Sequence, residues 1–139
     1  MNRHAIIVIK NKDNEYLQYF DKRWSSPLFP NCKLEEKFTN NTIIEYIERI
    51  LKIDKSYVEC TYIGEKIHTK FSESAKQMKE YDHFIFSIKI IEMSEIMRQG
   101  TFYINELNYK WYSYNELIND ERIQEVNGDI VGFIKEWNL

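Results

Sequence analysis

The feature that most constrains this chain is the alternation of apolar and other residues over 81–91. The apolar members of one face are Phe84, Phe86, Ile88 and Ile90. A period of two places successive side chains on opposite faces of a sheet, so this segment is expected to be a strand. A second run, Ala5 to Ile9, is apolar throughout, as expected of a strand that is buried on both faces.

Between these two strands, residues 41–53 have the spacing of an amphipathic helix with one buried stripe. The stripe consists of Ile43, Ile44, Ile47, Ile50 and Leu51. Thr39, Asn40 and Asn41 precede it and are favourable residues for the start of a helix. The chain therefore mixes strands with at least one helix that packs on the sheet.

Shorter signals complete the expected order of elements. We expect a return strand at 15–20, a loop at 21–30, strand residues at 57–71 with a break near Gly64, a polar loop at 72–80 and a short strand at 109–112. Ser113 and Glu116 have the spacing of a capping box, which predicts a short helix through Ile118. A last helix is expected over 129–137. The order predicts an α/β (α+β) sandwich, with a mixed curved sheet flanked by helices, as a single domain over 1–139.

Composition excludes several classes of protein. A formal net charge of -3 and a pI of about 5.7 argue against general nucleic-acid binding, which needs a basic surface. No apolar run approaches the roughly 20 residues that span a bilayer, and the first residues do not resemble a signal peptide. Cys32 and Cys60 form no disulfide or metal pattern. We therefore expect a cytoplasmic protein with reduced thiols and no membrane association.

Three strings, in this order, resemble the Nudix (MutT-like) hydrolase family over nearly the whole chain. The first is Arg23-Trp24-Ser25-Ser26-Pro27-Leu28-Phe29-Pro30, which is similar to the segment that leads to the Nudix box. The second, Asn31-Cys32-Lys33-Leu34-Glu35-Glu36, stands where Gly-Gly-Lys-Val-Glu is usual. The third, Lys110 to Leu117, resembles the strand-to-helix passage W-x-s-x-x-E-L. The resemblance implies a Nudix-like domain and a nucleotide or another phosphate-containing small molecule as ligand.

The box itself, G-x5-E-x7-R-E-U-x-E-E-x-G-U, is degenerate in this chain. With the apolar stripe on the family's buried positions, Glu45 stands at the box Arg and Tyr46 at its first helical Glu. Arg49 and Ile50 stand at the Glu-Glu pair, and Lys52 at the later Gly. The first glycine of the chain is Gly64, so no glycine-rich phosphate loop precedes the helix.

Loss of these carboxylates removes the expected metal ligands. In the family they bind Mg²⁺, which prefers anionic oxygen and activates water for attack on phosphorus. Glu45 and Glu48 share a helix face, but about 100° per residue places that face away from the family's metal side. A shifted register would expose Ile43 and Ile47, at roughly 1.5–3 kcal/mol each. We therefore expect no metal site and no cofactor, with Glu45, Glu48 and Glu36 as weak catalytic candidates.

Other residues are candidates for ligand binding without metal. The predicted set combines cations with aromatic or imidazole rings and consists of Phe20, Arg23, Trp24, Lys33, Arg49 and His83. The cations suit phosphate, and the rings could stack a base. Each also has a structural explanation: aromatic residues fill cores, and a histidine at a strand end often contacts the backbone.

The sequence supports three functions. The leading one is a nucleotide-binding or regulatory pseudo-enzyme of the Nudix superfamily that lacks Mg-dependent pyrophosphohydrolase activity. The first alternative is an active Nudix hydrolase with relocated Mg ligands, and the second is a protein-interaction domain that forms a homodimer.

Overall fold

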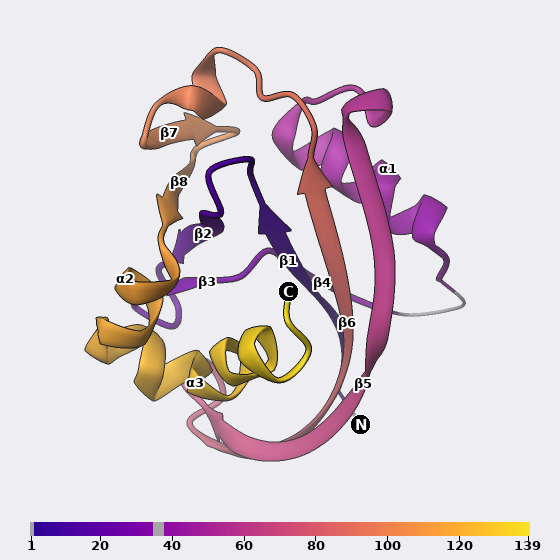
Figure 1. Cartoon of the computed structure of the whole chain (residues 1–139). Coiled ribbons are helices and arrows are strands. Elements are labelled where there is room, and N and C mark those ends of the chain that lie inside the picture. Colours follow the sequence, from indigo (N-terminus) through magenta and orange to yellow (C-terminus); the bar gives the residue numbers. More distant parts are fainter. Residues whose placement is uncertain (1, 35–37) are drawn as a thin grey trace.

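The computed structural model describes residues 2–34 and 38–139 and consists of one mixed sheet with helices on both faces (Figure 1). The sheet strands of the described residues are β1 (Asn2–Lys10), β2 (Tyr16–Asp21), β3 (Ser26–Leu28), β4 (Asn31–Lys33), β5 (Val58–Ser72), β6 (Gln77–Ile90), β7 (Thr101–Ile104) and β8 (Leu107–Tyr112). Their order is β5-β6-β1-β2-β8-β7, with β3 paired to β2 and β4 paired to β1. Only the β1–β6 pair is parallel among these strand pairs. The predicted α/β (α+β) class, a mixed curved sheet flanked by helices, is confirmed.

Helix α1 (Asn40–Leu51) covers one face of the sheet. Thr39 caps its start, with Thr42 completing the capping box, and Lys52 ends it in the left-handed conformation. Ile43, Ile47 and Leu51 are buried as predicted, whereas Ile44 and Ile50 are half-buried. The buried side of α1 is therefore the one that its apolar stripe predicted.

Helices α2 (Tyr114–Asn119) and α3 (Glu121–Glu136) cover the other face. The predicted capping box of α2 is present, because Ser113 accepts from the backbone N–H of Glu116 at 3.1 Å and Glu116 accepts from that of Ser113 at 2.9 Å. On β1, Ala5 and Ile7 pack toward α1, whereas Ile6 packs toward α3. Cover on both faces explains why the run from Ala5 to Ile9 is apolar at every position.

The long β5–β6 hairpin bends around α3 (Figure 1). Its two strands stay paired from Val58–Ile90 to Ser72–Gln77, with a bulge between Tyr62 and Gly64 that matches the predicted break. The prediction of a loop over 72–80 was wrong, because the turn occupies only the four residues between Ser72 and Gln77. Polar residues continue the alternation at this exposed hairpin end, and their polarity hid the strand.

Other boundaries also differ from the sequence predictions. α3 begins at Glu121, where the Asp120 side chain caps it by accepting from the backbone N–H of Ile123 at 2.9 Å, and a kink at Asn127 separates this first part from the predicted helix over 129–137. The predicted loop over 21–30 contains β3, and β7 was not predicted. Two short 3₁₀ helices, η1 (Lys55–Tyr57) and η2 (Ile96–Arg98), connect elements. None of the helices in the described part of the chain is long and apolar enough to cross a membrane.

Candidate functional site

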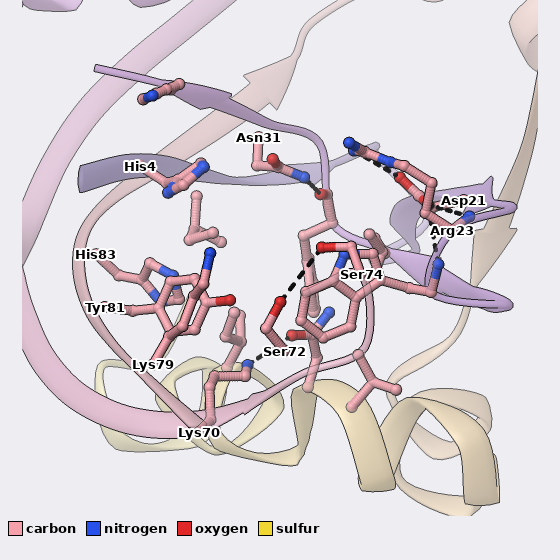
Figure 2. A pocket seen from close by; sticks show the side chains of 18 of the residues that line it. His4, Asp21, Arg23, Asn31, Lys70, Ser72, Ser74, Lys79, Tyr81 and His83 are labelled. Atoms are coloured by element: carbon pink, nitrogen blue, oxygen red, sulfur yellow. Dashed lines mark hydrogen bonds and ion pairs between the residues drawn. The ribbon is translucent and has the colours of Figure 1, made fainter. Parts of the chain in front are cut away.

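A cavity of about 250 Å³ lies between the sheet and α3. Figure 2 shows His4, Tyr81 and His83 at one end of this cavity and Asp21 and Arg23 at the other. The strands bring these residues together through their register, because His4 on β1 pairs with both His83 on β6 and Lys33 on β4. Side chains at these positions point to the same face of the sheet, which is the face that α3 covers.

Cations outnumber carboxylates in the wall of this cavity. Four of its lining side chains are cationic, namely Arg23, Lys33, Lys70 and Lys79. Asp21 is the only carboxylate among the described lining residues. The chain as a whole carries a formal charge of -3, so positive charge is concentrated here against the average of the molecule. Such a wall attracts an anion.

The segment that carries Arg23 and Trp24 is fixed at both ends. The carboxylate of Asp21 accepts from the backbone N–H groups of Arg23 at 2.8 Å and Trp24 at 3.1 Å. The Arg122 guanidinium on α3 donates to the carbonyl oxygens of Trp24 and Ser25. This loop therefore presents Trp24 to the cavity from a fixed backbone.

A cluster of polar side chains, in which His83 is buried and His68, Lys70 and Asp129 are half-buried, adjoins the cavity on β5, β6 and α3. Nδ1 of His68 lies 2.8 Å from the Asp129 carboxylate, and Nε2 of His68 lies 2.7 Å from Nδ1 of His83. Nζ of Lys70 also contacts Asp129, at 3.3 Å. Burial, together with the neighbouring His68 and Lys70, lowers the pKa of His83 to about 3. Burial alone would raise the pKa of Asp129, but the hydrogen bond from His68 and the charge of Lys70 lower it to about 2.

Tyr46 lies on the side of α1 to which the predicted alignment with the Nudix box assigns the metal ligands. Its hydroxyl donates to the carbonyl oxygen of Asn31 at 2.8 Å, and the Arg49 guanidinium lies 5.3 Å from the centre of its ring. Cys32 and Tyr19 pack beside it, and burial raises the pKa of both the Cys32 thiol and the Tyr46 hydroxyl. Neutral groups and a guanidinium do not suit Mg²⁺, which requires anionic oxygen. Across residues 2–34 and 38–139, no three His, Cys, Asp or Glu side chains are grouped so that they could hold a metal ion.

The structure brings together part of the predicted binding set. Arg23, Trp24, Lys33 and His83 line the cavity, whereas Phe20 and Arg49 are not among its lining residues. The role of all six in ligand binding stays a prediction.

The three weak catalytic candidates do not meet at this cavity either. Glu45 is exposed on α1, and Glu48 accepts from the backbone N–H of Lys55 at 3.2 Å. Glu36 lies outside the described residues, as does Glu35.

Sequence reasoning missed Lys70, His68 and Asp129. The first two alternate along β5 with Thr69 and Phe71, a period-two pattern that marks one polar face. Asp129 was read only as the start of the last helix. No sequence signal showed that α3 lies against this end of β5.

No family model and no curated protein sequence matches the chain. Solved structures do match it. The Ap4A hydrolase of C. elegans is 14% identical with a TM-score of 0.58, covering 99% of this chain and 96% of that one. A NUDIX family hydrolase from Clostridium perfringens is 16% identical with a TM-score of 0.59, covering 97% and 94%. The E. coli dihydroneopterin triphosphate pyrophosphohydrolase is 12% identical with a TM-score of 0.65, covering 94% and 95%.

These matches extend over nearly all of both chains in each pair, so the likeness covers the whole arrangement of strands and helices described above. The chain has the Nudix fold.

Proposed function

We propose that this protein is a Nudix-fold pseudo-enzyme that binds a nucleotide or another phosphate-bearing small molecule without Mg²⁺-dependent hydrolysis. The observation that carries the proposal is the cavity itself, which four cations line against one carboxylate. Two of these cations are engaged in ion pairs, Arg23 with Asp21 at 3.5 Å and Lys70 with Asp129 at 3.3 Å. Lys33, Lys79 and Arg23 would hold phosphate oxygens, and Trp24 would stack on a base or another planar group. Protein cations then neutralise the phosphate charge, a task that falls to metal ions in the family that the sequence resembles.

The solved structures of similar fold support a phosphate-bearing ligand by analogy. One is named as an Ap4A hydrolase and another as a dihydroneopterin triphosphate pyrophosphohydrolase. Both names describe compounds with a planar ring system and a chain of phosphates. A cavity with Trp24, Tyr81 and several lysines offers partners for both parts of such a ligand.

The experiment is calorimetry and thermal shift with nucleoside di- and triphosphates and dinucleotides, in EDTA. We expect binding to persist in chelator and to weaken in Trp24→Ala and in Arg23→Ala. Lys12→Ala removes an exposed cation of the β1–β2 turn and is the matched control, with unchanged affinity. Arg49 also belongs to the predicted binding set but does not line the cavity. Arg49→Ala tests whether it contributes to nucleotide affinity. If no nucleotide produces heat or a thermal shift, the proposal is wrong and the protein-interaction alternative gains.

The hydrolase alternative makes the opposite prediction. Turnover of any of these nucleotides in millimolar Mg²⁺, abolished by EDTA and by Glu45→Gln or Glu48→Gln, would show that metal ligands have been relocated. We expect no such turnover. The family's metal ligands would lie on the side of α1 that carries Tyr46, Arg49 and Ile50, and none of these side chains is a carboxylate.

A further inference from the structure

Three side chains from three elements form a continuous hydrogen-bonded path that ends at the cavity. Asp129 on α3 contacts Nδ1 of His68 on β5 at 2.8 Å, and Nε2 of His68 contacts Nδ1 of His83 on β6 at 2.7 Å. His83 is 4% exposed and lines the cavity. Its Nε2 makes none of the hydrogen bonds found among the described residues, and it is not one of their fully buried atoms that lack a partner. Since His68 engages Nδ1 and the residue lines the cavity, we assign Nε2 to the side of the ring that a ligand would meet.

The partners of this path determine where its hydrogens lie. A carboxylate can only accept, so Nδ1 of His68 carries a hydrogen that points to Asp129. When His68 is neutral, its Nε2 accepts, and Nδ1 of His83 must then be the donor. A neutral His83 with its hydrogen on Nδ1 presents an unprotonated Nε2 to the cavity.

We propose that Asp129, His68 and His83 form a proton relay, through which the binding of a phosphate-bearing ligand takes up one proton from solvent. The proposal rests on the phosphate-binding function above and adds proton coupling to it. A proton from solvent bonds to Nε2 of His83, and the hydrogen on Nδ1 of His83 passes to Nε2 of His68. The positive charge then rests on His68 beside Asp129, and His83 remains neutral with an N–H that donates to the phosphate.

The charges around the path explain why an anion would trigger this uptake. The titratable side chains around the hydrogen-bonded path come from every element that packs against it. They are His4 on β1, Lys33 on β4, Lys66 and Lys70 on β5, Lys79 and Tyr81 on β6, and Asp129 and Glu136 on α3. Two of these cations are already paired, Lys66 with Glu136 at 3.3 Å and Lys70 with Asp129. In the empty cavity the remaining cations oppose another positive charge. A bound phosphate cancels that opposition, and it would be repelled by a lone pair on Nε2 unless a proton lay between them.

Calorimetry with ADP in EDTA tests the coupling directly. At about pH 8 the terminal phosphate of ADP is already ionised, since its second pKa is about 6, so any proton taken up belongs to the protein. Titrations in two buffers of different ionisation enthalpy should give an uptake of about one proton per ADP. Asp129→Asn and His68→Gln should still bind ADP but lose this uptake. Glu121→Gln, which removes an exposed carboxylate of the same helix that does not line the cavity, should keep it.

Ring-nitrogen NMR of the wild-type protein provides a second readout that needs no variant to fold. Without ligand, His68 and His83 should both carry their hydrogen on Nδ1. With saturating ADP, His68 should be protonated on both nitrogens and His83 on Nε2.

Three results would overturn the relay. The first is heat of binding without proton uptake. The second is uptake that is unchanged in Asp129→Asn, or that is lost equally in Glu121→Gln. The third is a hydrogen on Nε2 of His83 in the free protein. Absence of any heat with ADP or the other nucleotides would instead overturn the proposed function, and the coupling with it. The NMR of the ligand-free protein would still report whether the relay exists.

Discussion

The hydroxyl of Tyr46 donates to the backbone carbonyl oxygen of Asn31 at 2.8 Å, and this contact joins α1 to β4. Asn31 continues the network, because its side-chain amide donates to the hydroxyl of Tyr19 at 3.0 Å and to the carbonyl of Phe29 at 2.9 Å. Tyrosine here is a structural residue that closes the space between helix and strand. A carboxylate at position 46 would face the carbonyl of Asn31 without a hydrogen to donate.

Removal of this hydroxyl should destabilise the fold. We expect Tyr46→Phe to lower the free energy of unfolding by about 1 kcal/mol, the usual net contribution of one hydrogen bond, or somewhat more because the carbonyl of Asn31 loses a partner. Urea denaturation measures the change. Tyr103→Phe is the matched control, since Tyr103 is 63% exposed on β7 and should change stability little. Equal effects of the two substitutions would contradict the structural role of Tyr46.

Divalent cations should not stabilise the protein. Binding to the folded state raises the free energy of unfolding by RT ln(1 + [L]/Kd), or about 2.7 kcal/mol at a hundredfold excess of ligand over Kd. We therefore expect the Tm to stay constant as Mg²⁺ or Mn²⁺ increases to millimolar concentration. A Tm that rises with Mg²⁺, and no longer rises in Glu45→Gln or Glu48→Gln, would mean that these carboxylates bind the ion and that the pseudo-enzyme proposal fails.

The register of α1 can be tested through two isoleucines. Ile47 is fully buried against the sheet, whereas Ile67 is 57% exposed on β5. Ile47→Ala should lower the free energy of unfolding by about 2–5 kcal/mol, because the lost contacts leave a cavity in the core. Ile67→Ala should change it by less than about 0.5 kcal/mol. Comparable losses at both positions would remove the argument that fixes Glu45 and Glu48 on the outer side of the helix.

Local patterns predicted most of the fold, because the elements that matter most carry their own signals. The stripe of α1, the alternation of β6 and the capping box of Ser113 each report burial or hydrogen bonding within a few residues. The sequence pattern failed where polar residues form paired strands. The ends of β5 and β6 next to the turn are rich in polar residues, yet they remain strands because they pair with one another up to the Ser72–Gln77 pair.

The candidate site was only partly predictable, for a different reason. His83, Lys33 and the loop with Arg23 and Trp24 could be proposed from the family resemblance, which fixes their approximate order around a cleft. His68 and Asp129 are 61 residues apart in the printed sequence, and their contact depends on the bend that brings β5 against α3. No local pattern encodes that bend, so the hydrogen-bonded path could only be seen in three dimensions.

The last prediction concerns the pH dependence of stability, which His83 should dominate above pH 4. In the folded protein its pKa is lowered from 6.5 to about 3, first by burial and then by the charges of His68 and Lys70. Between these values the unfolded chain binds the proton more tightly than the folded one. Stability from this residue is therefore complete above about pH 6.5 and is lost as the pH falls toward 3.

The expected slope is at most about 1.4 kcal/mol per pH unit for one proton. Asp129, whose pKa is also lowered, loses its contribution only below its ordinary value of 3.8, so its effect falls outside a series from pH 7 to 4. Urea denaturation over that series should show a falling free energy of unfolding in the wild type and a flatter profile in His83→Gln. His4→Gln is the comparison variant. Burial, together with Lys33 and Lys79, also lowers the pKa of His4, but His4 is only half-buried. The profile of His4→Gln should therefore flatten less than that of His83→Gln. A profile in His83→Gln as steep as that of the wild type would show that His83 is not held neutral in the folded protein.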